Sequence, residues 1–432
     1  MRGPARRLLI VCYFYPPLAG GGVHRVLGFT RYLPLHGWSC TVVCAGMEDY
    51  WVTDPSLLER VPPATEVVRV EGGSALSLWL RWRRQSGRRS GREFARWRAL
   101  GDWWLLPDSY AGWARRARAA ARRRLQAGGF DALLSSSPPD SVHMAALDLR
   151  RRFGIPWVAD FRDPWVGLHL RRPVTAWHRA AQAGLERRVL EGADLILAAS
   201  RTHAASLAAR PDRVCAGKVE HLPNGYEPKT ETPGDPASAP AHPDKFLIAY
   251  TGMLSQMPDT EVFLEALHEL LARRPEARRR VRARLAGPFD SGYADRAVAL
   301  GLTGIVEFSG PLPHREARAL QRRADLLLLW KPRDCPSMVP GKLYEYLDAG
   351  RPLGALLGTG EEASELVRQG GGTVIDPGDR GALAALIERH YLAWKEGERQ
   401  GASPPAWLAS NTRERLAARL AELLERLKGE RA

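Results

Sequence analysis

Residues 8–25 read LLIVCYFYPPLAGGGVHR, and this stretch indicates how the chain folds. An apolar run, Leu8–Cys12, leads into a turn with three glycines, and a helical pattern begins near Val23. Glycines at such a turn let the backbone approach a ligand, and the amides of the helix start point toward it. The stretch therefore predicts a strand of an α/β domain with Gly21 and Gly22 at a ligand-binding edge. A plain tight turn explains the glycines nearly as well.

The same alternation of short apolar runs and longer helical patterns continues along the chain. It predicts one parallel sheet in each half. The strands expected in the first half are Leu8–Cys12, Thr41–Cys44, Val67–Val70, Ala132–Ser135, Pro156–Ala159, Leu195–Ala198 and Val219–Leu222. Those expected in the second half are Phe246–Thr251, Ala283–Ala286, Val306–Ser309, Leu326–Trp330, Pro352–Leu357 and Gly372–Ile375.

These patterns predict an α/β fold of two Rossmann-like domains that face each other across a cleft. The N-terminal, acceptor-side domain is expected over 1–228 and the C-terminal, donor-side domain over 245–400. Between them, residues 229–244 are rich in Pro, Ser and Ala and read as a linker. Apolar residues at helical spacing over Pro405–Arg431 predict a long amphipathic helix, so that the segment 401–432 crosses back to the first domain.

Composition limits the location and the partners. The 432 residues carry a formal charge of +15, which attracts polyanions, but nearly all the cations are Arg, a bias that genome composition also produces. The five cysteines show no metal-ligand spacing, and their odd number argues against a disulfide framework. No apolar run approaches the ~20 residues of a membrane span. We expect a cytoplasmic protein, either soluble or peripheral on the inner face of the membrane.

A basic, Trp-rich insertion is expected near 80–125. Arginines interleaved with Trp suit an anionic bilayer, with the rings at the headgroup level. A solvated insertion whose Trp residues cover a neighbouring core explains the pattern equally well. Stacking of Trp on nucleic-acid bases is a third reading, but the chain contains no recognisable RNA- or DNA-binding module, so no nucleic-acid partner is expected.

A second informative stretch is PGKLYEYLDAGRP, residues 340–352. Pro and Gly open this predicted helix and Gly and Pro close it, while Lys342 and Glu345 lie on one face. The ammonium and the first-turn amides suit a phosphate, and the carboxylate one turn later suits the paired hydroxyls of a ribose. The alternative is an ordinary surface ion pair.

The segment ADFRDPW, residues 159–165, leaves another predicted strand with two acids around an arginine. Because two carboxylates alone make a poor metal site, we expect Asp160 and Asp163 to form a polar patch for sugar hydroxyls that Arg162 neutralises. No metal or cofactor is therefore expected. A buried Asp/Arg lock that shapes the loop is the structural alternative.

In the second half, three residues follow predicted strands at the same edge. Gly252 admits close backbone approach, and Lys331 and Arg333 bring two cations near the helix of Lys342. Basic groups from this domain and glycine amides from the other would clamp one diphosphate without a metal.

Six motifs in order, YPPLAGGGVHR, ADFRDPW, LPNGYEP (222–228), YTGML, DLLLLW and GKLYEYLDAGRP, resemble the GT-B glycosyltransferases, more narrowly the retaining family 4 that builds bacterial cell-surface glycans. The resemblance implies transfer of a hexosyl group from a nucleotide-diphosphate sugar, UDP- or GDP-linked, to a sugar or lipid-linked acceptor. It implies retention, a Glu345 that binds the ribose, and an Asn224 at the interdomain crossing. The pathway implied is that of cell-surface glycans or glycosylated metabolites.

Residue chemistry and resemblance together give three groups of candidate site residues. The catalytic candidates are Asp160, Arg162, Asp163 and Lys331. The candidates for donor binding are Gly21, Gly22, Gly252, Arg333, Lys342, Leu343 and Glu345. The candidates for acceptor binding are His24, Arg25 and Asn224.

Two departures from the family pattern keep other functions open. The acid expected eight residues before Glu345 is replaced by Ser337, and the segment Ser255–Pro258 lacks the basic pair expected after the Gly252 strand. A nucleotide-sugar epimerase or hydrolase on the same fold is one alternative. A membrane-bound scaffold with a decayed site is the other.

Overall fold

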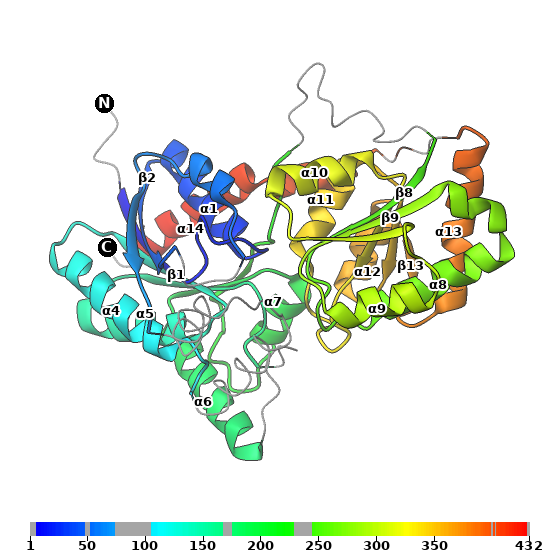
Figure 1. The fold of residues 1–432 in the computed structure, drawn as a ribbon. Helices are drawn as coiled ribbons and strands as arrows, with labels where there is room; N and C mark the ends of the chain where they lie inside the picture. The colour runs from blue at the N-terminus through cyan, green and yellow to red at the C-terminus, as the bar shows by residue number, and fades with distance from the viewer. Residues whose placement is uncertain are drawn as a thin grey trace. The chain divides into compact units, whose positions relative to one another are not determined.

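The computed structural model describes residues 6–47, 52–73, 105–166, 175–228, 244–398, 401 and 403–429. The chain forms two compact units (Figure 1). Unit 1 contains Met1–Gly225 and Asn411–Ala432, and unit 2 contains Tyr226–Ser410. The first boundary falls at Gly225 instead of residue 228, and the return to unit 1 at Asn411 instead of 401. Apart from Asp244, the predicted linker lies outside the described residues.

Unit 1 is built on a parallel sheet whose seven described strands have the order β3-β2-β1-β4-β5-β6-β7. The strands are β1 (Arg6–Cys12), β2 (Trp38–Ala45), β3 (Glu66–Val70), β4 (Ala132–Ser137), β5 (Trp157–Phe161), β6 (Leu195–Ala198) and β7 (Val219–His221). Both faces of the central β1 are buried, with Leu8 and Ile10 on one side and Leu9 and Val11 on the other. This explains why β1 reads as a continuous apolar run.

Helices cover both faces of this sheet. They are α1 (Val23–Tyr32), α4 (Ala111–Gln126), α5 (Ser141–Phe153), α6 (Ala176–Gly192), α7 (Arg201–Ala208) and α14 (Arg413–Gly429), with the 3-10 turns η1 (Leu33–His36) and η2 (Pro55–Arg60). α1 and α14 pack on one face, and α4 and α5 on the other.

The prediction of a basic, Trp-rich insertion near 80–125 can be compared with the structure only from residue 105 onward, and there it is wrong. Residues 74–104 lie outside the described part of the chain. From Ala111 onward, α4 is a core helix, not a surface insertion. Its Trp113 is fully buried and donates a hydrogen bond from Nε1 to the carbonyl oxygen of Val70 at 2.9 Å. The arginines of α4 lie on its exposed face, as expected for an amphipathic helix at the protein surface.

The predicted helix over Pro405–Arg431 is interrupted. The 3-10 turn η5 (Ala406–Asn411) precedes α14, because the Thr412 hydroxyl accepts a hydrogen bond from the Arg415 amide at 3.3 Å and starts the helix there. α14 buries its leucines against the sheet of unit 1, beside α1 (Figure 1). A Cβ atom built on Gly225 would lie 2.9 Å from the carbonyl oxygen of Asn411, so the two chain segments of unit 1 meet at this point.

Unit 2 repeats the plan with six described parallel strands in the order β10-β9-β8-β11-β12-β13. The strands are β8 (Phe246–Thr251), β9 (Val281–Ala286), β10 (Val306–Gly310), β11 (Leu326–Trp330), β12 (Leu353–Leu356) and β13 (Thr373–Ile375). The helices are α8 (Asp259–Arg273), α9 (Ser291–Ala299), α10 (His314–Arg323), α11 (Gly341–Ala349), α12 (Glu362–Gln369) and α13 (Arg380–Lys395), with the 3-10 turn η4 (Pro275–Arg279).

The predicted α/β class with two Rossmann-like units is confirmed. In each sheet the strand order reverses beside the first strand of the unit, between β1 and β4 and between β8 and β11. Open parallel sheets bind ligands at the carboxyl ends of the strands at such a reversal. The loops at these two strand edges are therefore the places to examine for a site.

Candidate functional site

The glycine turn of unit 1 leads directly into α1. Gly20 has a φ of +123°, which glycine adopts readily, and Gly22 is the residue before the helix. A Cβ atom built on Gly20 or on Gly21 would meet nothing within 4 Å. A Cβ on Gly22, by contrast, would lie 1.8 Å from Nη1 of Arg162. The last glycine of the turn is thus the place where a guanidinium packs against the backbone.

Arg25 and Asp160 form a buried ion pair. Nε of Arg25 lies 3.1 and 3.0 Å from the two carboxylate oxygens, and Nη2 lies 2.7 Å from Oδ1. Ser136 donates to the same carboxylate at 2.7 Å, and Nη1 of Arg25 donates to the carbonyl oxygen of Pro223 at 2.5 Å. Arg25 is 3% exposed and Asp160 is fully buried. The buried lock considered from the sequence is therefore present, but its arginine is Arg25.

Arg162 lies at the end of β5 with a different set of partners. Nε donates to the carbonyl oxygen of Ser137 at 2.7 Å and Nη2 to that of Pro138 at 2.6 Å. Burial is the main influence on this guanidinium and lowers its pKa, while the neighbouring Asp163 acts in the opposite direction. Asp163 is half-buried. The predicted trio thus does not act as one patch, since Asp160 is already paired with Arg25.

The other acceptor-side candidates lie close to this lock in the sequence. His24 precedes Arg25 in α1 and is half-buried, and Asn224 is half-buried directly after Pro223, whose carbonyl binds Arg25. The structure therefore brings α1 and the segment around Asn224 together through Arg25. The acceptor-binding roles of these residues stay predictions.

In unit 2, Lys342 lies over an aromatic ring at the strand edge. Its Nζ is 3.7 Å from the centre of the Tyr250 ring and donates a hydrogen bond to the Tyr250 hydroxyl. The ring itself stacks on Trp330, with centroids 4.1 Å apart. A Cβ on Gly252, where φ is +140°, would lie 2.9 Å from Nζ. Burial lowers the pKa of Lys342 well below its usual 10.5.

Glu345 lies one turn later on α11, as the sequence predicts, and its carboxylate is held from α10. Nε2 of His314 lies 3.1 Å from Oε1, and Nε2 of Gln321 donates to Oε2 at 3.3 Å. Gln321 also donates to Thr251 Oγ1 at 2.8 Å, which ties α10 to the end of β8. Glu345 is 9% exposed. This network fixes the carboxylate in one orientation at the carboxyl end of the sheet.

The other two candidate cations of unit 2, Lys331 and Arg333, already form ion pairs with carboxylates. Lys331 forms an ion pair with Glu361 at 3.0 Å and also donates to the carbonyl oxygen of Cys335 at 2.5 Å. Arg333 pairs with Asp259 at the start of α8 at 2.5 Å, which raises the pKa of this guanidinium. The charges of both residues are thus shared with protein partners. Leu343, the remaining donor candidate, is fully buried in the core.

The sequence reasoning missed five contributing residues: Tyr250, Asp259, His314, Gln321 and Glu361. His314 and Glu361 follow strands β10 and β12 at the edge where ligands bind, so the position after a strand was an available signal. No sequence pattern predicts that the Tyr250 ring lies beneath Lys342 and stacks on Trp330, because this arrangement depends on how neighbouring strands pack.

The expected absence of a metal site stays a prediction. Within the described residues, no group of three or more His, Cys, Asp or Glu side chains is arranged to hold a metal ion. Nor does any helix in the described part of the chain combine the length and apolar composition that a bilayer crossing requires.

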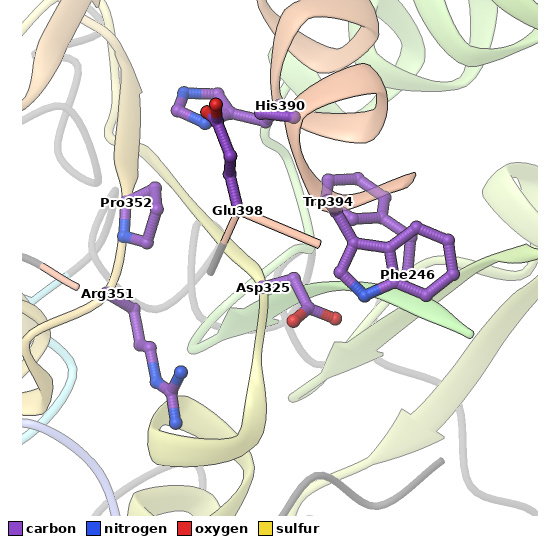
Figure 2. Close-up of a pocket in the computed structure, with 8 residues that line it drawn as sticks. Phe246, Asp325, Arg351, Pro352, His390, Trp394 and Glu398 are labelled. Carbon is purple, nitrogen blue, oxygen red and sulfur yellow. The ribbon is translucent and has the colours of Figure 1, made fainter. Parts of the chain in front are cut away.

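Two cavities lie at the opposite, amino-terminal edges of the sheets. The one in Figure 2 is bordered by Phe246, Asp325 and Arg351 at the starts of β8, β11 and β12, and its volume of about 10 Å³ admits a single water. The other, of about 390 Å³, is bordered in unit 1 by Asp194 and Lys218, which precede β6 and β7. Neither contains a predicted site residue.

Replacing Gly22 with alanine should destabilise unit 1 by about 1–3 kcal/mol, because the methyl group would displace the Arg162 guanidinium from its two carbonyl partners. Urea unfolding measures the effect. Gly21→Ala is the matched control, since a Cβ there meets nothing within 4 Å. Equal stability of the two variants would show that Arg162 adjusts without loss.

Two parallel Rossmann-like units with these strand-edge loops define the class of GT-B proteins. A family model described as glycosyl transferase 4-like domain matches residues 20–225. The match covers just under half of the chain and supports the family 4-like resemblance predicted from the motifs.

The chain is similar to a curated glycosyltransferase and to solved structures. D-inositol 3-phosphate glycosyltransferase 2 of Catenulispora acidiphila is 28% identical over 224 residues, 48% of this chain and 51% of that protein. The chain thus spans about half the length of this relative. HepE of Anabaena in complex with UDP and glucose has a TM-score of 0.63 at 15% identity, covering 97% of this chain and 99% of that one. Sucrose-phosphate synthase from Thermosynechococcus elongatus has a TM-score of 0.62 at 15% identity, covering 98% and 100%. At these identities the structures show a shared fold.

Proposed function

We propose that this protein is a glycosyltransferase that moves a hexosyl group from a nucleotide-diphosphate sugar to a sugar or lipid-linked acceptor, with retention. The observation that carries the proposal is the placement of Lys342 and Glu345 on α11 beside Gly252, at the reversal of strand order in unit 2. The UDP bound to HepE, which has the same fold, favours a UDP-sugar as donor. A cytoplasmic location, soluble or peripheral to the membrane, stays a prediction.

Charge compensation favours Lys342 as the residue that binds the donor phosphates. Lys331 and Arg333 share their charges with Glu361 and Asp259. Lys342 contacts an aromatic ring and a hydroxyl, and none of the described carboxylates forms an ion pair with it. Its positive charge is therefore available to an anion. The carboxylate of Glu345 would accept hydrogen bonds from the ribose hydroxyls, while His314 and Gln321 hold it in position.

The reaction would proceed on one face of the sugar. The bond between the anomeric carbon and the diphosphate oxygen breaks, and the acceptor oxygen forms the new bond to the same carbon. An oxygen of the leaving diphosphate takes the acceptor proton, so no protein nucleophile is required. The protein's task is to stabilise the negative charge that develops on the diphosphate, which Lys342 and nearby amides would do.

The test compares UDP with 2′,3′-dideoxy-UDP by calorimetry in the wild type and in Glu345→Gln. We expect the wild type to bind UDP without added magnesium and to prefer it over the dideoxy analogue by about tenfold or more, roughly 1.4 kcal/mol. The variant should lose most of this preference, because the carboxylate acceptor is gone. Glu365→Gln, an exposed change on α12, is the control and should keep the preference.

Incubation of UDP-glucose with no acceptor tests the alternatives. A transferase leaves the donor largely intact, whereas an epimerase or hydrolase converts it. A protein that binds none of UDP, GDP, dTDP, ADP or CMP would contradict the transferase proposal and favour the scaffold with a decayed site.

A further inference from the structure

A buried ion pair lies directly after two neighbouring strands of unit 2. Lys331 is the first residue after β11 and is 4% exposed, and Glu361 lies between β12 and α12. Nζ of Lys331 is 3.0 Å from Oε2 of Glu361. β11 borders β8, where the strand order reverses. The pair therefore belongs to the edge of the sheet at which ligands bind.

The Glu361 carboxylate is turned away from the helix that follows it. Glu361 is the residue before α12, yet its side chain caps no amide of that helix. Oε2 faces Lys331 instead, and Oε1 lies over Gly358, where a Cβ atom would come within 2.7 Å of it. No described residue donates a hydrogen bond to Oε1. One carboxylate oxygen is therefore available to a donor group on a ligand.

Lys331 also ties this carboxylate to the segment that leads into α11. Its Nζ donates to the carbonyl oxygen of Cys335 at 2.5 Å, midway between the end of β11 and the start of α11. The first turn of α11 contains Lys342, the residue proposed above to bind the donor phosphates. The ion pair thus lies against the segment that begins the proposed phosphate-binding helix.

The charge of the pair indicates what kind of group it suits. Glu361 matches the ammonium of Lys331, so the two together are neutral and attract no further anion. A carboxylate oxygen accepts hydrogen bonds from hydroxyl groups, and bonds to an ionised acceptor are the stronger ones. In a nucleotide-diphosphate sugar, the ring that carries the hydroxyls is bonded directly to the second phosphate. A ring whose phosphate is bound by Lys342 would lie close to the segment before α11.

We propose that Glu361, oriented by Lys331, binds hydroxyl groups of the donor's hexosyl ring and selects a neutral hexose over a hexuronate. A hexuronate would bring a second carboxylate toward Glu361, and the repulsion between like charges disfavours that sugar. The inference rests on the proposed function, because it names the sugar class of that reaction's donor.

The test measures by calorimetry how Glu361→Gln changes the affinities of the full chain for UDP and for four UDP-sugars. The neutral sugars are glucose, galactose and N-acetylglucosamine, and the charged one is glucuronate. We expect UDP affinity to stay within about twofold, while the best-bound neutral UDP-sugar loses about tenfold or more. UDP-glucuronate should bind as before or more tightly, because the repelling charge is removed.

Two further variants separate sugar binding from folding. Glu361→Asp keeps a negative charge beside Lys331 but draws the carboxylate back by one methylene. Its melting temperature should stay near that of the wild type while the affinity for the neutral UDP-sugar falls. Glu388→Gln is the matched control, since Glu388 pairs with Arg274 at 2.7 Å where α8 ends, at the opposite edge of the sheet. It should leave every affinity unchanged.

Two results would overturn the proposal. The first is a folded Glu361→Gln variant whose affinity for neutral UDP-sugars falls no more than its affinity for UDP, which would leave the ion pair a structural role. If that variant does not fold, an unchanged neutral-sugar affinity in Glu361→Asp has the same meaning. The second is a wild type that binds UDP but favours no neutral UDP-sugar over UDP-glucuronate. Failure to bind UDP at all contradicts the proposed function instead, so the two failures are distinguishable.

Discussion

Replacing Arg25 with methionine is expected to destabilise unit 1 by about 3–5 kcal/mol, because it removes one partner of a buried ion pair. Asp160 would remain fully buried with only Ser136 as a side-chain partner in the described structure. The carbonyl oxygen of Pro223 would lose its donor as well. Chemical denaturation of the variant and the wild type measures the loss.

Arg150→Met gives the matched comparison for this prediction. Arg150 and Asp194 have the same two-point geometry, but their side chains are 26% and 16% exposed. Solvent screening should reduce the loss there to about 1 kcal/mol. Adding Asp160→Leu to Arg25→Met should recover part of the stability, since no isolated charge then remains. Equal losses at Arg25 and Arg150 would contradict the view that burial makes the first pair important.

Replacing Lys342 with methionine should weaken UDP binding by about 10- to 100-fold, roughly 1.4–2.8 kcal/mol. The same change should leave the unliganded protein as stable as the wild type or more stable. Burial lowers the pKa of Lys342, so the charged form opposes folding in the absence of an anion. Calorimetry with UDP and thermal unfolding without it measure the two effects. A variant that lost stability and kept its UDP affinity would assign Lys342 to the core.

Both the stability of the unliganded protein and its UDP affinity should depend on pH, because burial lowers the pKa of Lys342. Between the lowered value and the usual 10.5, the unfolded chain holds a proton that the folded chain releases, so this contribution to stability rises with pH. UDP affinity should change in the opposite direction and fall as pH rises through the lowered pKa, because the cation is lost. Lys342→Arg stays charged over this range and should not show the fall.

Most of the fold follows from local sequence patterns. The strands β6, β8 and β11 match the predicted apolar runs end for end, because parallel strands buried on both faces must be apolar throughout. Two predictions differed where packing decided the outcome. The sequence of α4 suggests a basic surface segment. In the structure, its buried alanines and Trp113 pack in the core of unit 1, so α4 is a core helix. The break before α14 depends on a single threonine cap.

The candidate site was less predictable than the fold. Lys342, Glu345 and Arg162 could be predicted because each follows a parallel strand, and residues that follow such strands lie at the ligand-binding edge of the sheet. Charge pairing, in contrast, joins residues far apart in the chain. Nothing in ADFRDPW indicates that Asp160 pairs with Arg25, 135 positions away, or that Arg162 donates instead to the carbonyl oxygens of Ser137 and Pro138.

The contact between Gly225 and Asn411 has a consequence for connectivity. Because the two segments of unit 1 meet there, unit 2 is topologically an insertion within a single unit. Joining Gly225 directly to Asn411 through a short linker would retain every described element of unit 1, α14 included. A chain cut anywhere between these residues would lose α14, and with it the leucines that cover one face of the first sheet. Unit 1 is therefore separable by internal deletion and not by truncation.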